Sequence, residues 1–221
     1  MKIAIMQPYF FPYIGYYQMA NYVDTFVFLD DVNYIKKGWI NRNTLPVAGA
    51  QMFFTIPLQK ASQNNLICNT LISPSYIQWR EKFKKTLQQQ YGKSTGFSLY
   101  FNLLKQVLDT PHNTVSTLSA HSIISIAERL NMDTNFLFSS DLGCEGQGPQ
   151  RIMNICKHLD ATEYLNAPGG RHLYDKEWFK GYGVDLYFLQ PPAMVPSYSI
   201  IHSLLSDPDL SVEQMHDFKI K

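Results

Sequence analysis

Long apolar runs and disulfide-type cysteine patterns are both missing from this sequence. Its 221 residues include three cysteines, at positions 68, 144 and 156, which are far apart and form no C-x-x-C pair. An odd number of widely spaced thiols predicts neither a disulfide framework nor a zinc site. No run approaches the roughly 18 apolar residues of a spanning helix, and no basic segment with a cleavage site opens the chain. We therefore expect a cytoplasmic protein with reduced thiols and no membrane insertion.

Charge of one sign is not in excess either. The 19 Lys and Arg residues nearly balance the 18 Asp and Glu residues, which leaves a formal charge of +1 at pH 7. Such a balance offers no electrostatic footprint for duplex nucleic acid. The sequence has no P-loop, no G-x-G-x-x-G and no G-x-S-x-G, and its six histidines show no metal-ligand spacing. These absences argue against kinase-like, dinucleotide-binding and common hydrolase functions, and we expect no metal site.

Aromatic residues are plentiful, with 14 Tyr and 14 Phe, and apolar segments alternate with helical patterns along the chain. Segments rich in β-branched and aromatic residues predict strands at 3–6, 25–29, 51–58, 135–138, 163–165 and 184–189. Apolar residues at helical spacing predict helices at 16–22, 74–91, 99–108, 115–130, 149–159 and 199–205. The alternation predicts one α/β domain over residues 1–221, with a mainly parallel, Rossmann-like sheet covered by helices on both faces.

Most of the polar chemistry lies within residues 2–43. The order strand, helix, strand predicts a βαβ unit there, in which the loops 7–15 and 30–43 follow two adjacent parallel strands. A third polar loop, 166–171, follows a later strand. Ligands of open α/β sheets bind at the carboxyl ends of the strands. We therefore expect all three loops to line one cleft.

In the first loop, the candidate ligand-binding residues are Gln7, Tyr9, Tyr13, Gly15 and Tyr16. Two prolines within the loop restrict its backbone, which lowers the entropic cost of presenting polar groups to a ligand. The alternative is that these aromatic rings only pack beside the start of a helix.

The second loop begins with a carboxylate pair, Asp30 and Asp31. Successive side chains of a strand point to opposite sides, so we expect one of the two to be structural and favour Asp31 as the ligand-facing general base or ammonium anchor.

Further along the second loop, Lys37 and Arg42 are candidates to hold phosphates, and Lys37 is the second candidate catalytic residue. Trp39 offers a flat apolar face, and Asn41 and Asn43 add amide donors. The alternative is a solvated turn with Trp39 in the core.

The remaining candidates come later in the chain. Arg151 falls in the first turn of a predicted helix, where an anion is favoured, although surface solvation explains it equally well. Gly169 and Gly170 allow either a close approach to a ligand or a simple turn with positive φ, and Arg171 follows them.

This sequence resembles the WbqC-like family in five stretches: MQPYFFPYIGYYQ (6–18), LDDVNYIKKGWINRN (29–43), QRIMNIC (150–156), YLNAPGGRHLYD (164–175) and SYSIIHSLL (197–205). The resemblance implies a bacterial protein of surface-polysaccharide loci, such as O-antigen clusters, for which transfer of glycine onto a sugar has been proposed. The sequence departs from the family pattern at Phe83, where a histidine is expected, and at His202, where an aspartate is expected.

Three hypotheses follow. The first is an enzyme that transfers an acyl or aminoacyl group, such as glycine, to a nucleotide-linked amino sugar. The second is a non-catalytic sugar-nucleotide-binding protein. The third is an adenylating or nucleotidyl-transfer enzyme that uses ATP with a divalent metal such as Mg²⁺ near Asp30 or Asp31, because Tyr13-Ile14-Gly15-Tyr16 occupies the place of the His-x-Gly-His motif of nucleotidyltransferases. The cofactor thus stays open between ATP with Mg²⁺ and an aminoacyl or acyl-thioester donor.

Overall fold

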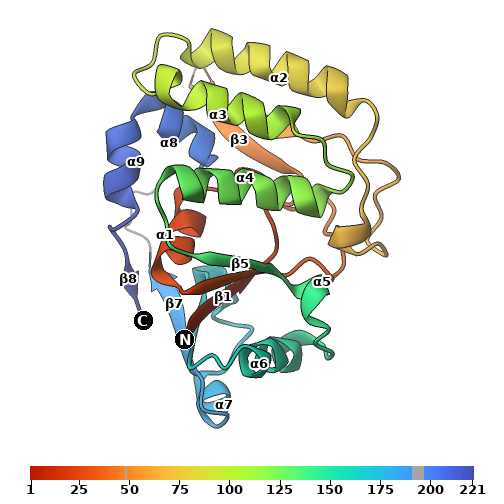
Figure 1. Ribbon diagram of the computed structural model, residues 1–221, viewed down its shortest axis with the longest axis vertical. Coiled ribbons are helices and arrows are strands. Elements are labelled where there is room, and N and C mark those ends of the chain that lie inside the picture. Colours follow the sequence, from red (N-terminus) through yellow and green to blue (C-terminus); the bar gives the residue numbers. More distant parts are fainter. Residues whose placement is uncertain (48, 191–196) are drawn as a thin grey trace.

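Parallel strands form the centre of this computed structural model, which describes residues 1–47, 49–190 and 197–221 (Figure 1). The sheet has the order β5-β2-β1-β6-β7-β8, and only the pairing of β8 with β7 is antiparallel. Its strands are β1 (Lys2–Met6), β2 (Thr25–Phe28), β5 (Asn135–Phe138), β6 (Glu163–Asn166), β7 (Asp185–Gln190) and β8 (Lys219–Ile220). The strand order reverses between β1 and β6, which is the topological switch point of a Rossmann-like sheet.

Helices cover both faces of the sheet, as the sequence predicts (Figure 1). The helices are α1 (Ile14–Tyr22), α2 (Tyr76–Tyr91), α3 (Phe97–Asp109), α4 (Val115–Arg129), α5 (Ser139–Leu142), α6 (Gly148–His158), α7 (Lys176–Lys180), α8 (Ile200–Ser206) and α9 (Pro208–Gln214), with 3-10 turns η1 (Ile67–Asn69) and η2 (Pro168–Gly170). Thr114 begins α4 as expected, because its hydroxyl accepts a hydrogen bond from Thr117 N.

The alternation of side chains along the strands divides the core in two. Ala4 and Phe26 lie in the larger apolar cluster, together with buried residues of α1, α2, α3, α4 and α8. Their neighbours Ile3 and Val27 face the other way, into a second cluster with residues of α6 and α7. Because both faces are buried, the strands are apolar almost throughout, as parallel strands usually are.

The strand predicted at 51–58 lies outside the main sheet. It is β4 (Ala50–Thr55), which pairs antiparallel with β3 (Arg42–Val47) in a separate two-stranded sheet. The predicted loop 30–43 therefore ends in a strand that begins at Arg42. The hairpin packs under α2 through Phe54, whose ring is 4.7 Å from that of Phe83, and this tertiary contact is invisible to a local pattern.

Other differences lie at element ends. The helix predicted from residue 74 begins at Tyr76, because the hydroxyl of Ser73 accepts from Ser75 N and forms a turn in front of it. The predicted loop 139–148 contains the short helix α5, and the polar tail contains α9 and β8.

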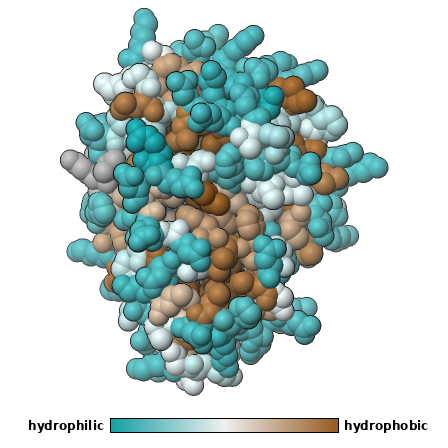
Figure 2. Space-filling model, in the orientation of Figure 1, coloured by the Kyte–Doolittle hydropathy of each residue, from teal (hydrophilic) through white to brown (hydrophobic). Residues whose placement is uncertain are grey.

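The surface in the same orientation is mostly hydrophilic (Figure 2). Hydrophobic residues gather in the middle and lower middle of this face, where Figure 1 places the edge strand β5. Within the described part of the chain, no helix combines the length and the apolar character that crossing a membrane requires.

Candidate functional site

Two of the predicted loops begin at or beside the switch point. The first follows β1 directly, and the second follows β2, which pairs with β1 in parallel register from Ile3 with Thr25 to Met6 with Phe28. Both loops therefore leave the sheet at the same end. The third loop follows β6 on the other side of β1.

Phe11 gives the first loop an unusual backbone. Its φ is +42°, a region that a bulky residue rarely adopts and that costs on the order of 1–3 kcal/mol. Side chains from three distant elements hold this residue. Asn43 Nδ2 and Ser199 Oγ donate to the Phe11 carbonyl at 2.8 and 2.7 Å, and Phe11 N donates to Ser122 Oγ at 3.0 Å. These bonds to β3, to the residue before α8 and to α4 offset the strain.

The first two loops meet at a pocket of about 180 Å³. Its lining residues come from both loops and from the segment before α8: Tyr9, Pro12, Tyr13, Trp39, Asn43 and Ser197. No described residue hydrogen-bonds to the hydroxyl of Tyr9 or Tyr13. Burial raises the pKa of both phenols, and Tyr9 adds to the effect at Tyr13. Both groups therefore stay protonated near neutral pH and can donate to a ligand.

Gly15 makes room for the Tyr13 ring. A Cβ at this position would lie 2.4 Å from Tyr13 Cε2 and 3.0 Å from its hydroxyl. The glycine has no positive φ, so its role is steric: it lets the ring fold against the first turn of α1 and form a pocket wall.

Tyr16 and Gln7 are joined within the protein. The Tyr16 ring is fully buried, and its hydroxyl donates to the Gln7 carbonyl. Burial is also the main cause of a strongly raised pKa of Tyr16. In this conformation Tyr16 fixes the loop and does not reach a ligand, whereas the half-buried Gln7 side chain has no hydrogen-bond partner among the described residues.

Trp39 lines the pocket and does not lie in the core, whereas Arg42 hydrogen-bonds to the turn. Trp39 is 43% exposed and stacks on Phe53, with 6.5 Å between ring centroids. The Arg42 guanidinium lies 5.7 Å from the Trp39 ring and 5.1 Å from the Phe53 ring. Arg42 also donates to the carbonyls of Gly38, at 3.0 Å, and Lys37. It therefore supports the turn that carries Trp39.

Lys37 lies in that turn with φ +60° and an exposed side chain. It is not among the residues that line the pocket.

Asn41 and Asn43 both form hydrogen bonds with backbone groups. Asn41 accepts from the Tyr34 hydroxyl and donates to the Ile56 carbonyl, at 2.8 and 2.9 Å. Asn43 holds Phe11, and its Oδ1 accepts from Thr44 N. Only Asn43 also lines the pocket.

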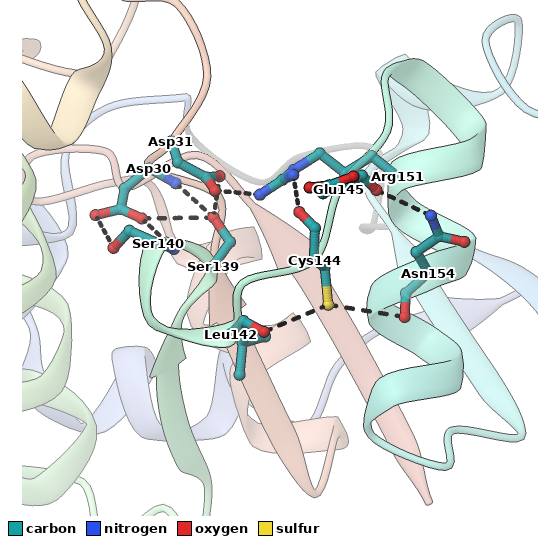
Figure 3. Close-up of polar contacts among 9 residues, drawn as sticks. All are labelled: Asp30, Asp31, Ser139, Ser140, Leu142, Cys144, Glu145, Arg151 and Asn154. Carbon is teal, nitrogen blue, oxygen red and sulfur yellow. Dashed lines mark hydrogen bonds and ion pairs between the residues drawn. The ribbon is translucent and has the colours of Figure 1, made fainter.

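Asp30 is buried, at 2% exposure, in a cluster of serine groups (Figure 3). Its Oδ2 accepts from the hydroxyls of Ser116, at 2.8 Å, and Ser140, at 3.2 Å, and its Oδ1 accepts from Ser140 N at 3.1 Å. Ser139 Oγ accepts from Asp30 N at 3.1 Å. Asp30 thus joins the end of β2 to α4 and α5.

Asp31 is the more exposed carboxylate, and it pairs with Arg151 of α6 (Figure 3). The side chains are 19% and 13% exposed. Ser139 Oγ donates to Asp31 Oδ1 at 2.5 Å, and Arg151 donates also to the Cys144 carbonyl. Arg151 Nε has no partner among the described residues. The pair thereby connects β2 to the start of α6 and leaves a carboxylate edge open to solvent.

The third loop lies apart from this pocket. It forms η2 without positive φ, and Gly170 is needed because a Cβ there would lie 2.7 Å from Asn166 Nδ2. Gly169 is exposed with open space around it. Arg171 lines a different pocket together with Phe188. The expectation of one cleft for three loops is thus met by the first two only.

Buried serines are the members of the site that sequence reasoning missed. Ser116, Ser119 and Ser122 repeat every three residues along α4 and are almost completely buried. Polar residues on the apolar face of a predicted helix are a signal that buried partners exist. That signal identifies the helix face, whereas the partners, Asp30 and Phe11, lie 86 and 111 residues away.

Comparison with known proteins covers most of the chain. Residues 7–206 match the WbqC-like protein family. The chain belongs to this family. The WbqC-like chain is also similar to a protein of Mycobacterium tuberculosis (strain ATCC 25618 / H37Rv) named "Uncharacterized protein Rv1507c", with 28% identity over 180 residues that span 80% of this chain and 77% of the relative. No solved structure matches.

The two departures from the WbqC-like pattern have structural roles here. Phe83 packs on Phe54 in the core. His202 Nδ1 lies 3.1 Å from the hydroxyl of Tyr91 and 3.1 Å from that of Ser206, and burial lowers its pKa. Neither residue lines the pocket of the WbqC-like site.

The carboxylate cluster does not fit a protein-held metal ion. The oxygens of Asp30 accept from hydroxyl and amide groups, and Asp31 is paired with Arg151. The described residues contain no group of three His, Cys, Asp or Glu side chains that is suited to a metal. The pocket offers hydrogen-bond donors and an aromatic face, and the partly exposed Asp31 carboxylate is not among its lining residues.

Proposed function

We propose that this WbqC-like chain transfers an acyl or aminoacyl group, such as glycine, to the amine of a nucleotide-linked amino sugar for bacterial surface polysaccharide. The observation that carries the proposal is the pocket with two free phenol hydroxyls and the exposed Trp39. Sugars are bound by hydrogen bonds to their hydroxyls and by packing of their apolar face on an aromatic ring. The pocket supplies both.

In this proposal the donor arrives already activated, as a thioester or an aminoacyl ester. The sugar amine attacks the donor carbonyl, a C–N bond forms, the C–S or C–O bond breaks, and the carrier leaves as a thiol or hydroxyl. Asp31 accepts a hydrogen bond from the amine, takes its proton and passes it to the leaving thiolate or alkoxide, while Ser139 and Arg151 orient the carboxylate. Lys37, exposed beside Trp39, approaches the phosphates of the sugar nucleotide.

The ATP-dependent alternative has less support. It assigns Tyr16 to a phosphate contact, and the Tyr16 hydroxyl is buried against the Gln7 carbonyl. No imidazole stands in the loop to balance phosphate charge. One observation favours the non-catalytic binding protein as the second candidate: Asp31 already has two partners within the protein.

The test has two stages. First, calorimetric titration with nucleotide-linked amino sugars should give saturable binding, and Tyr13→Phe should weaken it by about 2- to 12-fold, the range for one neutral hydrogen bond. Tyr182→Phe is the matched control, because Tyr182 is 46% exposed and lies outside the pocket. Second, mass spectrometry should detect the amide when an acyl thioester or aminoacyl-tRNA is added without ATP.

Three of the outcomes each support a different one of the three functional hypotheses. Product without ATP supports the transferase. Product with stoichiometric pyrophosphate release would transfer support to adenylation, and binding without product from any donor would leave a binding protein. Absence of saturable binding to any sugar nucleotide would refute the first two hypotheses together.

A further inference from the structure

A second pocket, of about 310 Å³, lies at the β7–β8 edge of the sheet. Its lining residues are Arg171, Tyr174, Lys176, Phe188 and Lys221. Three of the five are cations, and they come from three separate segments: the turn after η2, the start of α7 and the residue after β8. No lining residue is shared with the pocket of Tyr9 and Tyr13.

The positive charges of this second pocket form no ion pair with any residue that the structure describes. Among the described residues, no carboxylate, the terminal one included, lies within 4.0 Å of the side-chain nitrogens of Arg171, Lys176 or Lys221. Asp175 and Glu177 flank Lys176 in the sequence, and Glu177 and Asp185 line a neighbouring pocket together with Lys176. Asp175 accepts from Glu177 N at 2.9 Å and from Trp178 N at 3.3 Å as the cap of α7, and none of the three carboxylates forms an ion pair with Lys176.

An aromatic ring brings two of these charges together. The Arg171 guanidinium and the Lys176 ammonium each lie 5.8 Å from the centroid of the Phe188 ring. Cation–π attraction accounts for each contact alone, and Lys176 also lies 5.8 Å from the centroid of the Tyr187 ring, but two like charges near one ring repel each other. Phe188 is 4% exposed and belongs to the apolar cluster of α6 and α7, so the ring is a fixed floor. An anion placed between the two cations removes the repulsion.

We propose that this pocket binds the phosphate or pyrophosphate group of a small molecule. Arginine and lysine around one anion form charge-assisted hydrogen bonds, of which arginine can form two in parallel. Tyr174 adds a flat wall for the group that carries the phosphate. The volume is at the lower end of the usual range for small-ligand sites, roughly 300–1,000 Å³. The proposal is independent of the transferase function, because the two pockets are separate.

A small ligand fits this site better than nucleic acid does. The chain has a formal charge of only +1, and the cations gather in a concave site instead of along a stripe that could follow a strand. An oligonucleotide is therefore an alternative outcome of the test.

The experiment is titration of the ¹⁵N-labelled full chain with inorganic phosphate, inorganic pyrophosphate and ADP, followed by NMR and calorimetry. Amide shifts should be largest at Arg171, Lys176 and Phe188. The double variant Arg171→Gln, Lys176→Gln should raise the pyrophosphate Kd at least about tenfold, since each charge-assisted contact is worth about that factor. Higher salt should weaken binding as well.

Lys157→Gln is the matched control. Its ammonium lies 4.4 Å from the Tyr182 ring, so the variant removes an exposed lysine with the same kind of aromatic contact outside the pocket. Its Kd should equal that of the unmodified chain. An equal loss in the control, dispersed shifts, no saturation with any of the three probes, or binding of single-stranded RNA alone would each overturn the proposal. If the double variant does not fold, Lys176→Gln alone gives the same comparison.

Discussion

At position 15, the helix and the pocket favour different residues. Gly15 is the second residue of α1, and its missing Cβ is the space that the Tyr13 ring occupies. In a helix, alanine is better than glycine by about 1 kcal/mol. The helix alone would therefore be improved by a side chain at this position, and the pocket wall would be displaced by it.

Gly15→Ala should consequently weaken ligand binding without lowering the stability of the fold. We expect an unchanged or slightly higher melting temperature, because the Tyr13 ring is the far end of a side chain and can move away. Binding of the sugar nucleotide should fall by about the same factor as in Tyr13→Phe or more, and calorimetry together with thermal denaturation measures both. A fall in melting temperature with intact affinity would assign Gly15 to packing.

Arg42 illustrates a residue whose type suggests one role and whose contacts suggest another. A guanidinium near Trp39 fits a phosphate-binding role in the sequence. In the structure it donates to two carbonyls of the preceding turn and lies beside the stacked rings of Trp39 and Phe53.

Arg42→Ala should therefore destabilise the fold by roughly 1–3 kcal/mol, the cost of losing hydrogen bonds from a charged group. Arg42→Lys should restore little of this, since an ammonium cannot bridge both carbonyls and stack at once. Urea denaturation of the two variants measures the effect. Weaker phosphate binding with full stability would return Arg42 to a ligand-binding role.

At the scale of elements, a pair of histidines links the connection before α4 to α4 itself, with His112 in the connection and His121 in the helix. His112 Nε2 lies 3.0 Å from His121 Nδ1. Burial, and secondly the neighbouring His121, lowers the pKa of His112 to about 4. Burial also lowers the pKa of His121, against a smaller opposing effect of Glu128. Both pKa values lie below the value of about 6.5 for an unfolded chain.

The histidine pair predicts a loss of stability in mild acid. Between pH 6.5 and 4 the unfolded chain binds more protons at these two sites than the native one, so the free energy of unfolding decreases as the pH falls. Their contribution is complete above about pH 6.5. Urea denaturation from pH 7 to 4.5 should show a smaller decrease for His112→Asn than for the unmodified chain. His172→Asn, an exposed histidine, is the control; identical slopes in all three proteins would contradict the prediction.

Local sequence patterns predict the parallel sheet because its central strands β1 and β2 are buried on both faces and are largely apolar. The period of two predicts different environments for Asp30 and Asp31, and Asp30 is buried while Asp31 is partly exposed, although the Ser139 hydroxyl reaches both carboxylates. What local patterns cannot predict is pairing between distant segments. Arg151 is 120 residues from Asp31, and the turn at Arg171 gives no sign that it faces β8.

At the scale of the whole molecule, α8 ties the last part of the chain to the first loop. Ser199 N donates to the Thr44 carbonyl at 3.0 Å, and Ile200 N donates to the Pro12 carbonyl at 2.9 Å. Together with the bond from Ser199 Oγ to Phe11, these contacts fix the pocket from behind. Ser199 is fully buried.

Ser199→Ala should lower the free energy of unfolding by roughly 1–3 kcal/mol, because it removes both the bond to Phe11 and the cap of Ile201 N. Ligand affinity should fall as well, since Phe11 loses one of its constraints. Ser211→Ala is the control: Ser211 is also fully buried, but its hydroxyl donates to Asp207 within the same helical segment. Equal effects of the two variants on affinity would disprove the link between α8 and the pocket.

Because Ser199 holds the carbonyl of Phe11, the first loop cannot be fully secured during protein synthesis until residue 199 has been added. The two residues are 188 positions apart, and a ribosome adds about 5–20 residues per second. A nascent chain therefore carries the first loop for roughly 10–40 s before the serine that secures it has been made. Until then the chain has the tyrosines of the pocket without the bond from Ser199 that helps to arrange them, so a substrate meets the arranged pocket only after residue 199 has been made.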